Sequence, residues 1–140
     1  MTAPEAGAPG RTARDLGQRS MAAVEAGDRA AWLALFSDDA VVEDPVGPSM
    51  FDPEGRGHRG PEAIAAFYDN VIGVNESIRF TIRQSFLCGD EVANVGTIRI
   101  NFVGGGAVEV DGVYCYRMAP DGQLGGLRAF WEADKIRSVE

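Results

Sequence analysis

A few polar side chains of this sequence are expected to face the protein interior, and they are the first candidates for chemistry. Each residue is assigned to a face from the helical or strand period of its segment. A buried polar group must be hydrogen-bonded or functional, because burial without a partner is costly. The inward-facing candidates are Ser20, Asp44, Tyr68, Tyr114, Tyr116 and the indole of Trp131.

Asp44 is the strongest of these candidates. A short strand over residues 41–44 puts Val42 and Asp44 on one face, and no lysine or arginine shares that predicted face. A buried carboxylate then needs a raised pKa, a backbone hydrogen bond or a wet cavity. One interpretation is that Asp44 caps the turn at residues 45–47. The other is that it is a general base, since a carboxylate of raised basicity suits proton removal from carbon.

The hydroxyl groups allow two interpretations each. Tyr114 and Tyr116 are either donors to a substrate oxygen or ordinary sheet aromatics with the hydroxyl at the rim. Ser20 is either a further donor or a mid-helix serine bonded to the Leu16 carbonyl. His58 is the only histidine, and its Gly- and Arg-rich surroundings indicate a loop residue rather than a catalyst.

Composition excludes several classes of function. The chain has 140 residues, 45% of them hydrophobic, and a formal net charge of −8. Its length fits one domain, and its acidity disfavours nucleic acid and anionic membranes as partners. No apolar run approaches the roughly 20 residues that a membrane span needs. With a single histidine and no metal-ligand spacing, we expect no metal and no cofactor.

The termini and cysteines give further expectations. Residues 1–12 are expected to form a disordered tail, and residues 13–140 a single domain. The tail has neither a basic start nor an apolar stretch, so we expect no signal peptide and a cytoplasmic protein. Two cysteines could form a disulfide on count alone, but Cys88 and Cys115 are expected to be buried free thiols.

The elements that must position these residues are helices first and strands second. Helices are predicted over residues 13–25, after an N-cap at Asp28 and through Phe36, and from Pro61 to Ile72. A loop is predicted over residues 45–60. Four strands then follow as a meander, near residues 78–83, 98–102, 108–117 and 127–132. Helices followed by strands predict an α+β fold with helices on one face of an antiparallel sheet.

Three segments of the chain, in order, resemble the Δ5-3-ketosteroid isomerase family. They are DDAVVEDPVG at residues 38–47, AAFY at 65–68 and AFW at 129–131. The resemblance implies the NTF2-like or SnoaL-like fold: a cone in which three N-terminal helices pack on a curved antiparallel sheet and enclose an apolar pocket. FDPEG at residues 51–55 resembles the steroid-isomerase-like proteins of actinobacteria in particular.

The resemblance also implies a mechanism and a set of site residues. An aspartate moves a proton from C4 to C6 of a 3-oxo-Δ5-steroid while an oxyanion hole holds the dienolate oxygen. The base falls on Asp44, and the oxyanion-hole positions fall on Ser20 and near Tyr114, in place of the usual tyrosine and aspartic acid. The residues expected to line or support the pocket are Tyr68, Trp131, Phe36, Tyr116 and Leu127.

Three functions therefore remain open. The first is a steroid Δ5-isomerase, and the second is a binding protein for a steroid or a similar flat apolar ligand. The third is a polyketide cyclase or epoxide hydrolase of the same fold, although no second inward acid is found near Asp44. We also expect a homodimer through the outer sheet face, where Phe130 lies among charged residues.

Overall fold

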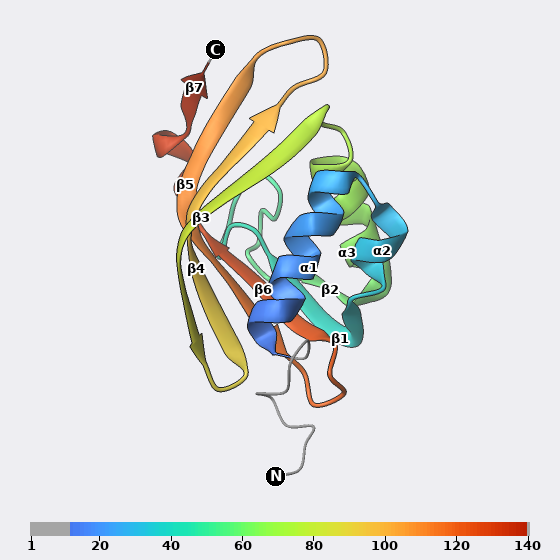
Figure 1. Ribbon diagram of the computed structural model, residues 1–140. Coiled ribbons are helices and arrows are strands. Elements are labelled where there is room, and N and C mark those ends of the chain that lie inside the picture. The colour runs from blue at the N-terminus through green and yellow to red at the C-terminus, as the bar shows by residue number, and fades with distance from the viewer. Residues whose placement is uncertain (1–11, 140) are drawn as a thin grey trace.

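The computed structural model, which describes residues 12–139, places its helices together on one side of a curved sheet (Figure 1). Apart from Thr12, the expected N-terminal tail lies outside the described residues. The elements are α1 (Ala13–Ala26), α2 (Arg29–Leu33), β1 (Phe36–Glu43), β2 (His58–Arg59), α3 (Gly60–Phe67), a π-helical turn η1 (Tyr68–Ile72), β3 (Ser77–Cys88), β4 (Glu91–Asn101), β5 (Ala107–Met118), β6 (Leu124–Phe130), a 3₁₀ turn η2 (Ala133–Lys135) and β7 (Arg137–Val139).

The ends of the first helix are fixed by its sequence. The Thr12 hydroxyl accepts a hydrogen bond from the Asp15 amide, and the Asp15 carboxylate accepts one from the Thr12 amide, both at 3.1 Å. Gly27 ends α1 in the left-handed conformation with φ of 68°. Asp28 then caps α2 by accepting from the Ala31 amide. These contacts confirm the predicted start of α1 and the predicted boundary between the two helices.

The structure corrects the predicted elements in three places: one helix boundary and two strands that were not predicted. Phe36 is not helical, because α2 ends at Leu33 and Phe36 begins β1. The reason is strand pairing: the Leu124 amide donates to the Leu35 carbonyl, so the chain joins the sheet earlier than expected. The predicted loop 45–60 also contains β2, and the C-terminal strand β7 was not predicted.

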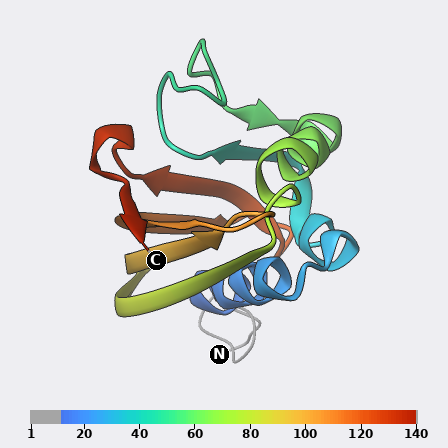
Figure 2. The ribbon, with the colours of Figure 1, turned by 90° about the horizontal axis from the view of Figure 1, so that it is seen from above.

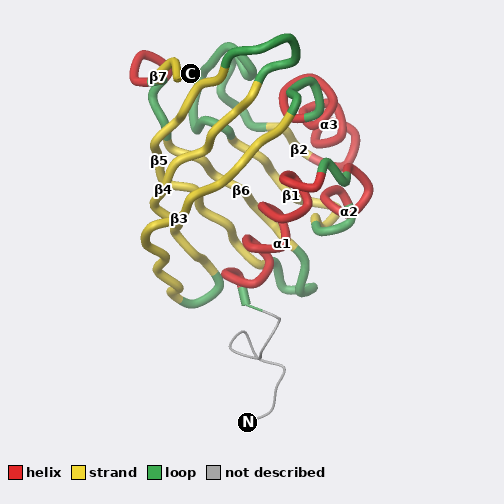
Figure 3. Tube along the Cα trace, turned by 45° about the horizontal axis from the view of Figure 1, so that its top comes forward, coloured by secondary structure: helices red, strands yellow, loops and turns green. Residues whose placement is uncertain are grey.

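The strands form one mixed sheet in the order β2-β1-β6-β5-β4-β3, with β7 beside one end of β5 (Figure 3). The meander from β3 to β6 is confirmed. The expected curved sheet is confirmed, and it is antiparallel except for one pair: β1 and β6 run parallel, with Val42 opposite Leu127. This parallel pair brings the first half of the chain beside its last long strand.

The sheet curves around the side on which the helices lie (Figure 2). The inward faces predicted for Tyr114 and Tyr116 are confirmed: both line the interior from β5, together with Val108 and Val110, while Asp111 is exposed. None of the helices described is long and apolar enough to cross a membrane.

Both cysteines are free, as expected, but neither is fully buried, because Cys88 is exposed and Cys115 is half-buried. Cys88 is the last residue of β3 and leads directly into the turn at Gly89. Within residues 12–139, no group of three or more His, Cys, Asp or Glu side chains is placed to hold a metal ion.

Candidate functional site

A cavity of about 240 Å³ lies between the concave face of the sheet and the helices. Most of its wall is aliphatic or aromatic, which suits a flat apolar ligand. Asp44 is the only carboxylate on that wall among the described residues. The residues that line the cavity are Ser20, Val24, Trp32, Asp44, Met50, Phe51, Phe67, Val71, Ile72, Asn75, Ile78, Phe80, Ile98, Ile100, Phe102, Val108, Val110, Tyr114, Tyr116, Leu127, Ala129, Trp131 and Ile136.

The parallel pairing of β1 with β6 positions Asp44. The Val46 amide donates to the Ala129 carbonyl at 2.9 Å, which continues the contact between the two segments beyond β1. Asp44 therefore lies beside the end of β6, and its Oδ1 accepts a hydrogen bond from Trp131 Nε1 at 2.6 Å. The structure thus shows an indole, rather than an amide of the turn at residues 45–47, as the donor to Asp44.

The environment of Asp44 favours its protonated form. Burial raises the pKa of the carboxyl group, and the hydrogen bond from Trp131 and the nearby His58 oppose that rise without cancelling it. The side chain is only partly covered and still reaches the cavity. It therefore combines raised basicity with access to a ligand, which are the two properties required of a general base.

Ser20 lies on the cavity wall but already has a partner. Trp32 Nε1 donates a hydrogen bond to Ser20 Oγ at 3.0 Å, and both side chains are buried. Ser20 also lowers the pKa of Tyr116, as a hydroxyl that donates to the phenol oxygen does. No hydrogen bond to the Leu16 carbonyl is found among the described residues.

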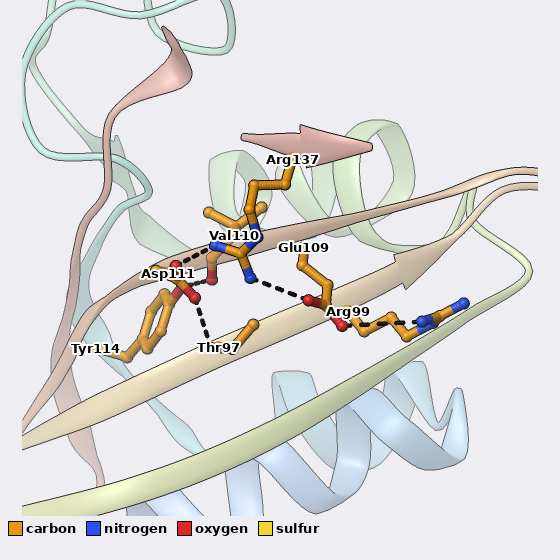
Figure 4. Close-up of polar contacts among 7 residues, drawn as sticks. All are labelled: Thr97, Arg99, Glu109, Val110, Asp111, Tyr114 and Arg137. Atoms are coloured by element: carbon orange, nitrogen blue, oxygen red, sulfur yellow. Dashed lines mark hydrogen bonds and ion pairs between the residues drawn. The ribbon is translucent and has the colours of Figure 1, made fainter. Parts of the chain in front are cut away.

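The Tyr114 hydroxyl donates a hydrogen bond to the Val110 carbonyl at 2.7 Å, within the same strand (Figure 4). Burial raises the pKa of this phenol, and the charge of Asp44 raises it further. Asp111 lies on the other face of the sheet, where it accepts from Thr97 and pairs with Arg137 (Figure 4). Asp111 is therefore not an acid of the cavity.

The other residues expected around the pocket divide into two groups. Leu127, Tyr116 and Trp131 are on the cavity wall. Phe36 and Tyr68 are not on that wall and pack against Trp32, with ring centroids 4.7 and 5.4 Å from its ring centroid. They support the wall instead of forming it.

Sequence patterns missed several cavity residues. Met50 and Phe51 come from the connection between β1 and β2, and Ile136 comes from the segment before β7. No period places a loop side chain, so only the resemblance of the FDPEG segment marked that connection. Trp32 lies within the helix predicted after Asp28, but nothing in the sequence indicates that it donates a hydrogen bond to Ser20.

His58 is closer to the site than its loop-like surroundings suggested. It lies in β2 opposite Val42, and its ring centroid is 4.7 Å from that of Phe67, a cavity residue. Its Nε2 is buried without a hydrogen-bond partner among the described residues. His58 is among the groups that lower the pKa of both Asp44 and Asp52, so it influences the proposed base electrostatically.

Residues 18–124 match the profile of the SnoaL-like domain, which is more than half of the chain. This chain belongs to the SnoaL-like domain family. The match begins within α1 and runs through β5 to the start of β6, and it includes the connection between β1 and β2, so the expected fold is confirmed.

Solved structures of SnoaL-like relatives agree with this assignment. A Δ5-3-ketosteroid isomerase from Mycobacterium sp. is 38% identical, with a TM-score of 0.85 over 91% of this chain and 98% of that one. RV0760c from Mycobacterium tuberculosis is 37% identical, with a TM-score of 0.85 over 91% and 96% of the two chains. RV0760c has also been solved in complex with estradiol-17β-hemisuccinate, at 38% identity and a TM-score of 0.82 over 89% and 96%. The resemblance to the ketosteroid isomerase family is therefore confirmed.

Proposed function

We propose that this protein is a ketosteroid Δ5-isomerase in which Asp44 is the general base. The observation that carries the proposal is a carboxylate of raised pKa, the only one within residues 12–139 on the wall of a largely apolar cavity. The relatives add support, because they include a Δ5-3-ketosteroid isomerase and a protein solved with an estradiol derivative.

The proposed reaction is a transfer of one proton within the substrate. Asp44 removes a proton from C4 of a 3-oxo-Δ5-steroid, and the electron pair delocalises to give a dienolate with its charge on the C3 oxygen. The same carboxyl group then returns the proton to C6, so the double bond ends in conjugation with the ketone. The hydrogen bond from Trp131 orients the carboxylate without donating to the steroid.

Turnover of androst-5-ene-3,17-dione tests the proposal. We expect saturable formation of the conjugated 4-ene-3-one, measured by its ultraviolet absorbance. A protein that turns over no 3-oxo-Δ5-steroid under these conditions would exclude the isomerase assignment.

The pH dependence of the reaction should follow the raised pKa of Asp44. Only the carboxylate form can accept the proton, so kcat/KM is expected to rise with pH through the pKa of Asp44 and then level off. The midpoint should lie above the value of about 3.9 for an exposed aspartic acid. A rate that stays constant down to that ordinary value would contradict the assignment of Asp44 as the base.

A steroid-binding protein with little turnover is the second candidate. The observation that favours it is the state of the expected oxyanion-hole residues. The Tyr114 hydroxyl donates to a backbone carbonyl, and the Ser20 oxygen already accepts a hydrogen bond from Trp32. Tight binding of androst-4-ene-3,17-dione by calorimetry, together with no isomerisation, would select this function.

Cyclase or epoxide hydrolase activity receives less support from the site. The epoxide hydrolase/cyclase-like enzyme SalBIII shares the fold, with a TM-score of 0.75, but at 18% identity it bears on the fold alone. Epoxide opening is expected to use a second acid near the base, and Asp44 is the only carboxylate on the cavity wall within residues 12–139.

We further propose a homodimer through the outer face of the sheet. Val95, Val113 and the exposed Phe130 stand opposite one another across β4, β5 and β6, so they form a continuous apolar row. We expect light scattering after size-exclusion chromatography to give twice the mass of the chain at micromolar concentration, and Phe130→Asp to give the monomer. A monomeric wild-type protein would contradict this proposal.

A further inference from the structure

Not every hydroxyl group on the cavity wall can donate a hydrogen bond to a ligand, because some already donate within the protein. Among the residues that the structure describes, three on this wall carry a hydroxyl: Ser20, Tyr114 and Tyr116. The Tyr114 proton is directed at the Val110 carbonyl at 2.7 Å, so it is not available to a ligand in this arrangement. A donor to a ligand oxygen must therefore come from the pair formed by Ser20 and Tyr116.

Gly17 determines where the Tyr116 ring lies. A Cβ atom at position 17 would be 2.7 Å from Cδ1 and 3.1 Å from Cε1 of Tyr116, so any larger residue would displace the ring. Gly17 has an ordinary helical conformation within α1, so a positive φ does not explain the glycine. Glycine destabilises a helix interior relative to alanine, and here it allows the phenol ring to lie against α1.

Ser20 lies one turn further along α1, on the same face as Gly17. Its oxygen accepts the hydrogen bond of Trp32 Nε1 at 3.0 Å, and its hydroxyl group acts on Tyr116 by lowering the pKa of that phenol. Ser20 lowers the pKa of Tyr116, as a hydroxyl that donates to the phenol oxygen does, so the Ser20 proton is directed at Tyr116. The Tyr116 hydroxyl lies on the cavity wall, and no hydrogen bond from it to an acceptor is found within residues 12–139.

We infer that Tyr116 is the catalytic hydrogen-bond donor to the carbonyl oxygen of the ligand, and that Gly17, Ser20 and Trp32 are positioning residues for it. The inference rests on the proposed isomerase function, for which it supplies the oxyanion donor. As Asp44 takes the C4 proton, negative charge develops on the C3 oxygen, and the Tyr116 hydrogen bond strengthens there. Tyr116 keeps its proton throughout, so the proton balance of the reaction is unchanged.

Two further properties fit this role. Burial raises the pKa of Tyr116, so the phenol remains protonated and able to donate at neutral pH. The charge of Asp44 also raises that pKa, which indicates that the phenol and the base act on the same region of the cavity. Donation from Trp32 to Ser20 and from Ser20 to Tyr116 polarises the final hydroxyl group and makes it a better donor.

Comparison of two tyrosine variants tests the inference. Tyr116→Phe and Tyr114→Phe each remove one hydroxyl from the same face of β5 and keep the ring. We expect Tyr116→Phe to lower kcat for androst-5-ene-3,17-dione by about 10²–10³-fold, the usual effect of losing one oxyanion donor. Tyr114→Phe should lower kcat by less than about tenfold. Equal losses, or a larger loss in Tyr114→Phe, would overturn the inference.

A binding measurement separates this inference from the proposed function. Androst-4-ene-3,17-dione labelled with ¹³C at C3 is bound to each variant, and the C3 resonance is recorded by NMR. A hydrogen bond to the carbonyl moves this resonance downfield, whether or not the protein catalyses isomerisation. We expect the downfield shift in the wild-type protein and in Asp44→Asn, a smaller one in Ser20→Ala, and none in Tyr116→Phe.

The outcomes distinguish the donor role of Tyr116 from the isomerase function. A shift that depends on Tyr116 in a protein without turnover would support the donor assignment and exclude the isomerase. Turnover that depends on Asp44, with the same C3 resonance in wild type and Tyr116→Phe, would support the isomerase and overturn the donor assignment. Circular dichroism and thermal melting of Tyr116→Phe show whether the variant is folded, and binding at unchanged stoichiometry confirms that its cavity is intact.

Discussion

Asp44→Asn is expected to lower kcat for androst-5-ene-3,17-dione by about 10²–10⁴-fold, the usual contribution of a general base. The amide has nearly the same shape and keeps an oxygen that can accept the Trp131 hydrogen bond. It cannot take a proton from C4, because a carboxamide is a far weaker base than a carboxylate. Steroid affinity should be retained, so the loss is expected in kcat rather than in KM.

The same variant should be more stable than the wild-type protein at neutral pH. The pKa of Asp44 is raised in the folded state, so ionisation of this group opposes folding. Its contribution to stability is fully present at low pH and is lost as the pH rises through the folded pKa. Asparagine carries no charge to bury, so we expect a higher Tm at pH 7 and a smaller difference under acid conditions. Retained activity would contradict the assignment of Asp44 as the general base, and an unchanged Tm would contradict its raised pKa in the folded state.

Trp32→Ala is expected to have the largest effect on stability, about 3–5 kcal/mol in the free energy of unfolding. Trp32 is 1% exposed and packs against Phe36 and Tyr68. Removal of the indole leaves a cavity behind the wall of the site and deprives Ser20 of its donor. The change is measured as the shift of the urea midpoint at an unchanged slope.

Trp32→Phe is the matched control for this prediction. It keeps a buried aromatic ring and removes the N–H group that donates to Ser20. The loss in the free energy of unfolding should therefore be smaller, about 1–3 kcal/mol, which is the range for a buried polar group that loses its partner. If Trp32→Ala unfolded at the same urea concentration as the wild-type protein, the packing assigned to α2 would be wrong.

Much of the fold could be predicted because its signals are local. Thr12, Gly27 and Asp28 mark helix ends through caps that involve only neighbouring residues. The strand period placed Tyr114 and Tyr116 inside, as the structure shows. The parallel pairing of β1 with β6 joins residues far apart in the sequence, and alternation within a strand does not specify its neighbour.

The partners of the inward hydroxyl groups could not be predicted in the same way. Strand period gives the face of Tyr114 but not the Val110 carbonyl that its proton reaches. Helical spacing gives the face of Ser20 but not the indole of Trp32. From the sequence, Gly17 is only a residue of low helix propensity. Its role in making room for the Tyr116 ring is visible only in the structure. Each of these contacts depends on tertiary packing.

The fate of a deuterium label at C4 tests the central claim most directly. Androst-5-ene-3,17-dione deuterated at C4 is converted in ordinary water, and the early product is analysed by mass spectrometry and NMR. A carboxyl group in an apolar cavity is shielded from rapid exchange, so the account predicts that much of the transferred deuterium is found at C6. A product whose added C6 hydrogen comes entirely from solvent would contradict the role of Asp44 as a single base that removes and returns the same proton.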